Sequence, residues 1–398
     1  MPNSNLNPED VVIVSAARTP MGGFQGSLAG ISATELGAVA IRGVLTRSGI
    51  EGLQIDEVLM GNVLSAGVGQ APARQAALGA GLAQSTPCTT ISKVCGSGMK
   101  SVMLAYDQIK AGSCQVAIAG GMESMSRSPY FLEKARGGMR LGHGEIKDHM
   151  FFDGLEDAYT GKAMGSFAQS TADSMGITRE AMDDYALESL RRANAAIADG
   201  SFNAEIEPVT ITGRGGDTIV SVDEQPGNAK PDKIPQLRPA FAKDGTITAA
   251  NSSSISDGAA ALLLMSAARA NELGLQPVAK IVAHANHARA PGEFTLAPID
   301  SVQKVLAKAD WTVEDVDLFE INEAFAMVTM LAIQGLGLSA ERVNVHGGAC
   351  ALGHPIGASG ARIIVTLLHA LQQAGKTKGI ASLCIGGGEA TSIALEIV

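Results

Sequence analysis

The sequence predicts an α/β protein built from two similar halves, and three observations support this prediction. Apolar runs typical of buried strands alternate with segments of helical spacing. The alternation occurs twice, once near each end of the chain. The composition, with 47 glycines and only 4% aromatic residues, suits close-packed layers of strands and helices better than a β-sandwich.

Length, charge and cysteine content limit the class of protein. The chain has 398 residues, of which 46% are hydrophobic and 18% charged, so it can bury a large core and is not globally disordered. A net charge of −10 excludes a general nucleic-acid-binding field. No targeting segment is evident, and no apolar stretch approaches the ~20 residues that span a bilayer. Five cysteines predict no disulfide framework, so we expect a cytoplasmic protein with free thiols and no membrane or nucleic-acid partner.

The two halves begin with matching strands and helices. Val11–Val14 and Ala279–Ala283 are apolar runs that each predict a buried strand. A helical pattern follows each run, starting at Glu35 in the first half and at Ile299, directly after Pro298, in the second. The same order of elements at both ends predicts an internal duplication.

The match continues further along each half. Asp56–Asn62 and Asp315–Asn322 predict short strands that both end in asparagine. Cys95–Gly98 and Gly357–Gly360 predict small-residue turns that open helices. The last matching pair comprises strands predicted to end in tight glycine turns, Val116–Gly121 and Ala381–Gly387.

These patterns divide the chain into predicted domains. The N-terminal half covers 1–124 and the C-terminal half covers 275–398. Residues 125–247 differ from both halves in composition and predict an inserted loop domain, with a long amphipathic helix near Arg179–Asp199. Residues 248–274 turn apolar again, and we expect them to return to the first half.

Cys95 is a candidate nucleophile. It follows an apolar strand end and precedes Gly96-Ser97-Gly98 and a predicted helix. A helix N-terminus favours the thiolate, and nearby backbone N–H groups can stabilise an oxyanion. The alternative is a buried structural cysteine.

His354 is a candidate base. It lies in the glycine-rich segment Gly347–Arg362, directly before Pro355. Such loops let the backbone approach a ligand closely, and a histidine there could deprotonate a thiol. The alternative is an ordinary satisfied or surface histidine.

Two further polar residues end strands on the same side of the predicted sheet. Cys384, just before Gly386, could move a proton as a second thiol, or could be a core cysteine. Asn322 could donate from its amide to a carbonyl oxygen, directly or through water. It could instead cap a helix that begins at Glu323. Cys350 is four residues from His354, but no CxxC or HxxxH pair accompanies them, and we predict no metal site.

Six segments together resemble the thiolase family, and within it the acetyl-CoA acetyltransferases. Their order and spacing cover nearly the whole chain. They are VCGSGMKS at Val94–Ser101, AGGMESMS at Ala119–Ser126, NSSSISDGAAAL at Asn251–Leu262, NEAFA at Asn322–Ala326, GGACALGHPIGASGAR at Gly347–Arg362 and CIGGG at Cys384–Gly388.

The resemblance implies a layered α-β-α-β-α fold and a reaction: Claisen condensation of two acetyl-CoA molecules to acetoacetyl-CoA and CoA, with the reverse thiolysis. Cys95 would carry the acyl group as a thioester, His354 would activate Cys95, and Cys384 would be the acid/base for the acetyl methyl group. One oxyanion hole would comprise His354 and a water held by Asn322. The other would comprise the backbone N–H groups of Cys95 and Gly386.

The resemblance also implies substrate contacts and partners. Acetyl-CoA, acetoacetyl-CoA and CoA would be the substrates, with no cofactor or metal. Ser253 would lie along the pantetheine arm, and the insertion would bind the nucleotide end of CoA. Met164, Ala324 and Phe325 would contribute to the acyl pocket. We expect a homotetramer or a homodimer.

One departure concerns substrate choice. Many biosynthetic thiolases carry histidine before the Met-Gly of the insertion, where this chain has Ala163 before Met164. This leaves a broader or degradative 3-ketoacyl-CoA thiolase as the alternative function. A non-catalytic lipid- or CoA-binding module would not need the four residues Cys95, His354, Cys384 and Asn322 together. Metal analysis would exclude the other alternative, a structural zinc protein.

Overall fold

The computed structural model describes residues 6–398, and one mixed sheet of ten strands runs through the protein. The first half contributes β1 (Val11–Arg18), β2 (Gly22–Gly23), β3 (Glu57–Gly61), β4 (Cys88–Ile91), β5 (Val116–Ser124) and β10 (Ser256–Ser266). The second half contributes β11 (Ala279–Ala288), β12 (Leu318–Ile321), β13 (Lys378–Ile385) and β14 (Glu389–Ile397).

The strand order confirms the duplication. Hydrogen-bonded neighbours follow the order β12-β13-β14-β11-β1-β10-β5-β3-β4. The two halves meet at β1 and β11, which share a short antiparallel ladder with Val12 opposite Lys280 and Ile13 opposite Ala279. Outward from this junction, β1-β10-β5-β3 and β11-β14-β13-β12 repeat one arrangement, and in each half the last two strands are parallel.

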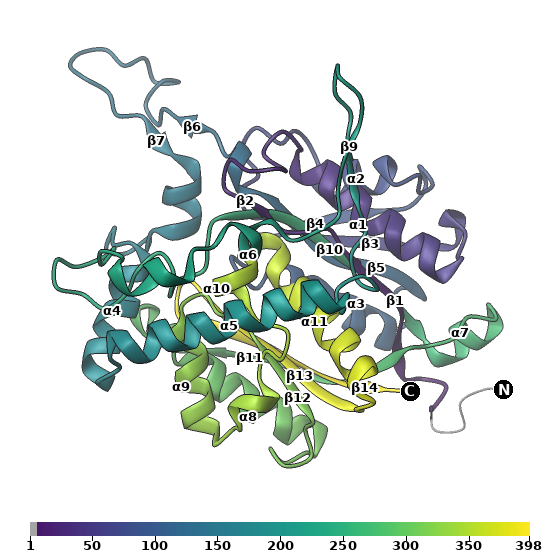
Figure 1. The fold of residues 1–398 in the computed structure, drawn as a ribbon. Helices are drawn as coiled ribbons and strands as arrows, with labels where there is room; N and C mark the ends of the chain where they lie inside the picture. Colours follow the sequence, from purple (N-terminus) through teal and green to yellow (C-terminus); the bar gives the residue numbers. More distant parts are fainter. Residues whose placement is uncertain (1–5) are drawn as a thin grey trace.

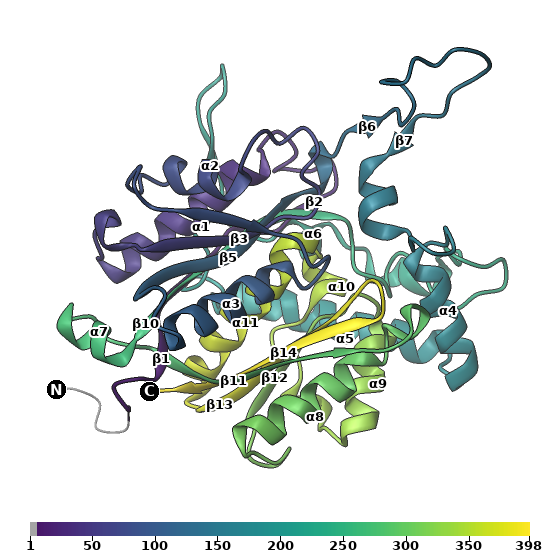
Figure 2. The same cartoon turned by 180° about the vertical axis from the view of Figure 1, so that it is seen from behind.

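Helices form the layers around and between the halves (Figure 1; Figure 2). α3 (Ser97–Lys110) and α11 (Ile356–Ala374) lie between them and share one core with β5, β10 and β13. α1 (Ala33–Ser48) and α2 (Pro72–Gly79) cover the outer face of the first half, and α8 (Ala297–Ala309) and α9 (Ala326–Leu336) cover the second. The predicted α-β-α-β-α layering is therefore confirmed.

The central helix α11 is buried around nearly its whole circumference, because neighbouring elements cover it on all sides. Ile363, Leu367 and Leu371 face the shared core and have no solvent exposure. The first turn of α11 is rich in small residues, so this end of the helix can approach the strands of the first half closely.

One expectation about glycine turns is wrong. Gly120 and Gly121 do not end β5 but lie within it. A Cβ on Gly120 would lie 2.1 Å from the carbonyl oxygen of Ala260, and one on Gly121 would lie 2.0 Å from that of Gly357. These glycines therefore permit close approach of a neighbouring strand and of α11 rather than a turn.

The inserted segment covers one end of the layered body with short elements and one long helix. Its hairpin β6–β7 projects away from the body in both views (Figure 1; Figure 2). The predicted helix near Arg179–Asp199 is confirmed as α5, with the same bounds. The described elements are β6 (Tyr130–Phe131), β7 (Lys147–Asp148), a π-helical turn (Phe151–Leu155), α4 (Met164–Met175), α5 (Arg179–Asp199), β8 (Val209–Ile211), β9 (Thr218–Val220) and α6 (Glu224–Asn228).

The remaining helical elements are short connections. They are α7 (Ala267–Glu272), α10 (Ala349–Leu352) and the 3-10 turns Gly52–Gln54, Met125–Arg127, Pro231–Gln236, Pro291–Glu293 and Ala340–Arg342. No helix within residues 6–398 is long and apolar enough to cross a bilayer. All five cysteines are free.

A buried charge cluster fastens the insertion to the first half. Arg18, at the end of β1, pairs with Glu205 at 2.5 Å and with Asp223 at 2.7 Å. All three side chains are almost wholly buried. Removing one partner of such a pair leaves an uncompensated buried charge and costs about 3–5 kcal/mol.

The domain boundaries inferred from the sequence stay a prediction.

Candidate active site

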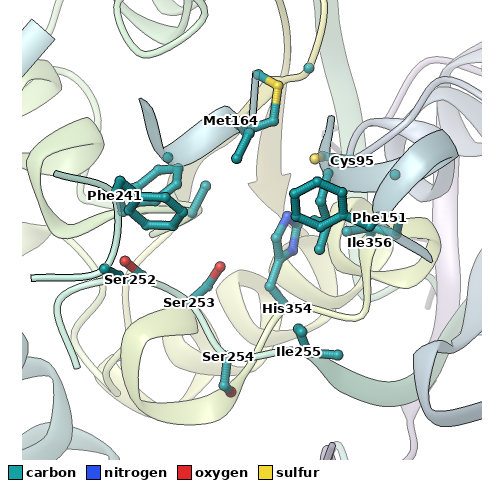
Figure 3. Close-up of a pocket in the computed structure, with 18 of the residues that line it drawn as sticks. Cys95, Phe151, Met164, Phe241, Ser252, Ser253, Ser254, Ile255, His354 and Ile356 are labelled. Carbon is teal, nitrogen blue, oxygen red and sulfur yellow. The ribbon is translucent and has the colours of Figure 1, made fainter. Parts of the chain in front are cut away.

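A cavity of about 450 Å³ opens where the insertion meets the starts of α3 and α11 and the end of β13. Eight of the nine site residues named from the sequence line it: Cys95, Met164, Ser253, Ala324, Phe325, His354, Cys384 and Gly386. Asn322 does not. In Figure 3 the sulfur of Cys95 and the imidazole of His354 turn toward the same space, with Ser252, Ser253 and Phe241 across it.

Cys95 lies in a tight turn between β4 and α3. Val94, directly before it, has a left-handed backbone with φ of 46°, a conformation that is costly for a β-branched residue. Gly96 caps the helix, which begins at Ser97, and the Ser97 hydroxyl accepts from the N–H of Lys93. The turn therefore holds the Cys95 thiol at the cavity wall.

The Cys95 thiol does not have the thiolate character that its place near a helix N-terminus favours. Cys95 is half-buried in the cavity wall, and desolvation of its thiol by the surrounding protein raises its pKa to about 11. The backbone N–H groups of Gly386 and of Cys95 itself are directed at the sulfur and oppose the rise. Desolvation outweighs the helix N-terminus, so the thiol must lose its proton to a neighbouring base during reaction.

His354 has the protonation state that such a base requires. It precedes α11 and is 6% exposed. Burial, and then the positive charge of Arg362, lower its pKa to about 3, so the ring is neutral at pH 7. Its Nε2 has no partner among the described residues, while Nδ1 lies 2.5 Å from the Ser359 hydroxyl.

The hydrogen bonds of Ser359 indicate which ring nitrogen of His354 is free. The Ser359 hydroxyl donates to the carbonyl of Pro355 at 2.9 Å, so it accepts from Nδ1–H of His354. This arrangement places the proton of the neutral ring on Nδ1 and leaves Nε2 as an acceptor. The sequence analysis missed Ser359; the only sequence signal is a serine one helical turn into the segment that His354 begins.

Cys384 is the penultimate residue of β13, and Gly386 begins the turn to β14. Burial, and then the nearby Cys95, raise the pKa of Cys384 well above its usual value. Both thiols are therefore protonated at rest and close enough to influence each other's ionisation. Cys384 can therefore act first as an acid, by donating its proton, and then as a base in its thiolate form.

Asn322 ends its strand without capping a helix, so that alternative is wrong. Residues 323–325 are not helical, and α9 begins only at Ala326 with Phe325 as its N-cap. The Asn322 backbone N–H donates to Ser382, two residues before Cys384, at 3.0 Å. Its amide oxygen and nitrogen are both buried and have no partner in the described chain. A buried amide without partners costs free energy and is available to a water or a ligand.

The loop after Asn322 is tied to the serine segment opposite. Ser253 donates its N–H to the carbonyl of Ala324 at 3.0 Å, and Ala326 donates to Asn251 at 2.9 Å. Ala324 and Phe325 are consequently fixed in the cavity wall beside Ser253. This pairing joins the first and second halves across the site.

A second group of cavity residues was not named individually from the sequence, although the segment Phe151–Met164 was expected to wall the acyl pocket. They are apolar and come from distant parts of the chain, and only Ile356 lies within one of the motifs, Gly347–Arg362: Met150, Phe151, Leu155, Phe241, Phe294 and Ile356. The positions of Met150, Phe241 and Phe294 in the cavity follow only from the fold, because each is an ordinary hydrophobic residue in sequence. Ala163 lines the same cavity, so a small side chain stands where a histidine would add volume.

Glu123 is a buried carboxylate that the sequence analysis also missed. It accepts from the N–H groups of Val63, Leu64 and Gly357 and from the amide of Asn62. Burial raises its pKa to about 7 despite these donors. Glu123 thus connects the loop after β3 to the first turn of α11, three residues after His354.

Within residues 6–398, no three His, Cys, Asp or Glu side chains cluster as metal ligands would.

Comparison with known proteins gives a consistent result. The family model described as "Thiolase, N-terminal domain" matches residues 11–268, and "Thiolase, C-terminal domain" matches 275–397. The chain is 50% identical to the acetyl-CoA acetyltransferase of Cupriavidus necator, covering 97% of this chain and 99% of that protein. It is 50% identical to the acetyl-CoA acetyltransferase of Escherichia coli, covering 98% and 99%.

Solved structures agree. The acetyl-CoA acetyltransferase of Bacillus anthracis has a TM-score of 0.95 at 42% identity, covering 98% of this chain and 99% of that one. A thiolase of Ascaris suum in complex with coenzyme A has a TM-score of 0.93 at 42% identity, covering 98% and 100%. Fold and family together define an acyltransferase. The chain belongs to the thiolase family.

Proposed function

We propose that the protein is an acetyl-CoA acetyltransferase, which condenses two acetyl-CoA molecules to acetoacetyl-CoA and CoA and catalyses the reverse thiolysis. The observation that carries the proposal is the meeting of two thiols and one neutral imidazole, Cys95, Cys384 and His354, in a single apolar cavity. The names and full-length similarity of the relatives support it.

In the first half-reaction Cys95 becomes acetylated. Nε2 of His354 accepts the thiol proton as sulfur attacks the thioester carbonyl carbon of acetyl-CoA. The bond between that carbon and the CoA sulfur breaks, and the departing thiolate takes a proton from Cys384. The products are acetyl-Cys95, free CoA, an imidazolium and the Cys384 thiolate, so every proton is accounted for.

In the second half-reaction the carbon–carbon bond forms. The Cys384 thiolate removes a proton from the methyl group of a second acetyl-CoA. The resulting carbanion attacks the carbonyl carbon of acetyl-Cys95, and the carbon–sulfur bond to Cys95 breaks. His354 returns its proton to the Cys95 sulfur, which restores the starting enzyme.

Two sets of donors would stabilise the oxyanions. The N–H groups of Cys95 and Gly386 are directed at the Cys95 sulfur, so a thioester oxygen formed there lies near both donors. The unpartnered amide of Asn322 would hold a water that, with His354, serves the carbonyl of the acetyl-CoA. The chemistry would use only these groups, with CoA thioesters as substrates rather than cofactors.

A broader or degradative 3-ketoacyl-CoA thiolase is the second candidate function, and the small, apolar side chains in the cavity wall support it. Ala163 lines the wall beside Met164, and the surrounding residues are apolar. Each additional buried methylene can gain up to ~0.8 kcal/mol where it fits, so chains longer than four carbons gain affinity if space remains. We expect the short substrate still to be preferred.

The test is thiolysis of 3-ketoacyl-CoA substrates with four, eight and twelve carbons, compared by kcat/KM. The acetyltransferase assignment predicts the highest value for acetoacetyl-CoA. A twelve-carbon value above the acetoacetyl-CoA value would instead assign the degradative function. A Cys95→Ser variant supplies the matched background rate.

Assembly and location belong to the same proposal. We expect a homotetramer or homodimer in the cytoplasm, with Ser253 along the pantetheine arm and the insertion at the nucleotide end of CoA. Light scattering coupled to gel filtration measures the mass directly. A mass near that of one chain at micromolar concentration would contradict the assembly.

A further inference from the structure

One stretch of the insertion, here called the pocket wall and comprising residues 150–155, closes the cavity beside Cys95. Met150, Phe151, Gly154 and Leu155 of this wall line the cavity. Five of its six residues, Phe151–Leu155, form the π-helical turn, and Met150 is the N-cap of that turn. Such turns are uncommon and cluster at functional sites.

The wall packs closely against the helix that follows His354. A Cβ on Gly154 would lie 3.1 Å from Cδ1 of Ile356 and 3.4 Å from Cδ2 of Leu64. Met150 belongs to the same apolar cluster as Ile356 and Leu64, against which Cys95 also packs. A small displacement of the wall therefore changes the shape of the cavity at the reacting sulfur.

The two ring nitrogens of His149 contact the pocket wall on one side and the loop at Ala66 on the other. Its side chain is 8% exposed. Nε2 lies 3.3 Å from the backbone N–H of Ala66, and Nδ1 lies 2.5 Å from a carboxylate oxygen of Asp153 within the wall. The ring also meets Phe131 edge to face, with centroids 6.3 Å apart.

The hydrogen-bond partners of His149 determine which tautomer its imidazole adopts. A backbone N–H can only donate, so Nε2 accepts from Ala66 and carries no proton. Nδ1 then carries the proton of the neutral ring and donates to Asp153. The loop before Ala66 is anchored by Glu123, which accepts from Val63 and Leu64.

Glu123 completes the connection to the catalytic helix. The same carboxylate accepts from the N–H of Gly357 at 2.9 Å, in the first turn of α11. His149 therefore links the pocket wall, through the loop at Ala66, to the group that fixes the start of α11.

We propose that His149 is a positioning residue that sets acyl-chain selectivity by holding the pocket wall against Ile356. It touches no substrate and lies outside the set of cavity residues. It acts through Met150, Phe151 and Gly154. The inference rests on the proposed function, because the substrate that the wall shapes is a 3-ketoacyl-CoA.

The experiment compares three variants with the full-length enzyme. His149→Phe keeps an aromatic ring against Phe131 but has neither acceptor nor donor. His149→Gln keeps one acceptor and one donor on a planar amide, so it can reproduce both bonds. His143→Phe makes the same substitution in the exposed part of the β6–β7 segment and is the matched control.

Steady-state thiolysis of four-carbon and eight-carbon 3-ketoacyl-CoA gives kcat and KM for each variant. With His149→Phe, the KM for acetoacetyl-CoA rises roughly tenfold, which corresponds to the net loss of about one hydrogen bond. The preference for four over eight carbons falls by a similar factor, while kcat changes less than about threefold. His149→Gln restores the wild-type KM and selectivity, and His143→Phe leaves both unchanged.

Hydrogen exchange of the peptide covering 150–155 adds a readout that needs no turnover. Faster exchange in His149→Phe than in His149→Gln is expected, because only the former lacks both bonds. Equal kinetics and equal exchange in these two variants overturn the inference. If the wild type shows no thiolysis of either substrate, the proposed function fails, and the exchange comparison still decides the role of His149.

One more substitution, Asp153→Ala, tests the proposal if the His149→Phe variant does not fold. Asp153 has a side chain that is 48% exposed, so Asp153→Ala tests the Nδ1 side of the contact without emptying a buried site. A partial shift in selectivity in the same direction supports the proposal. Unchanged selectivity and exchange in Asp153→Ala, with His149→Phe unfolded, contradict it.

Discussion

Replacing Ser359 by alanine removes the group that orients the base. The Ser359 hydroxyl is fully buried and is the acceptor 2.5 Å from Nδ1 of His354. Without it the Nδ1–H is a buried donor with no partner, which costs about 1–3 kcal/mol. The ring can relieve this cost by moving or by carrying its proton on Nε2, and the latter form cannot accept from Cys95.

The expected effect is a loss of acylation rate. A cost of 1–3 kcal/mol corresponds to a rate reduction of roughly 5- to 150-fold. The assay is the single-turnover release of CoA when enzyme is mixed with acetyl-CoA, which isolates formation of acetyl-Cys95 from the later carbon–carbon step.

Ser101→Ala is the matched control. Ser101 is also fully buried, lies in α3, and donates back one turn to Ser97 at 3.0 Å, as Ser359 donates back to Pro355. The two alanine variants lose the same kind of helical contact, so both should show similar changes in Tm. If Ser359→Ala acylates within twofold of Ser101→Ala, the reasoning about His354 orientation is refuted.

Four further predictions use separate measurements. Cys384→Ser should retain acylation, because a CoA thiolate leaves readily, but lose condensation, because serine is a far weaker acid; equal loss of both half-reactions would argue against its role. Because the pKa of His354 is lowered to about 3, its ring stays neutral as the pH falls, and the acylation rate should not decline between pH 7 and pH 5; a decline centred near 6.5 would contradict that pKa. Ala163→His should lower kcat/KM for an eight-carbon substrate about tenfold relative to acetoacetyl-CoA, and an unchanged ratio would remove Ala163 from the selectivity argument. Gly121→Ala, whose Cβ would lie 2.0 Å from a carbonyl oxygen of α11, should destabilise the fold by about 3 kcal/mol or more, while Gly30→Ala, with nothing within 4 Å, should not; equal denaturation midpoints would contradict this.

Periodic and repeated features were predictable from the sequence. The duplication followed from strands and helices recurring in the same order, and the structure repeats that order on each side of the β1–β11 junction. The bounds of α5 were predictable because its apolar spacing is regular and Thr178 and Gly200 cap its ends. The motifs around Cys95, His354 and Cys384 pointed to residues that the fold brings to one cavity.

Features that depend on distant contacts were not predictable. A helix N-terminus beside Cys95 favours a thiolate locally, but surrounding protein raises the pKa to about 11, and sequence gives no measure of that burial. Gly121 resembles a turn residue until Gly357 of α11 is placed against it. Similarly, His149 belongs to no motif, and the role proposed for it rests on contacts with Ala66 and Asp153 that only the folded structure shows.

The central claim is that Cys95 carries the acyl group and His354 removes its proton. The most direct measurement is incubation with acetyl-CoA, acid quenching, and peptide mass spectrometry at short times. We predict an acetyl group on the Cys95 peptide in the wild type, no acetyl group there in Cys95→Ser, and much slower labelling in His354→Ala. Label found mainly on Cys384 or Cys350, or undiminished labelling of Cys95 in His354→Ala, would contradict the account.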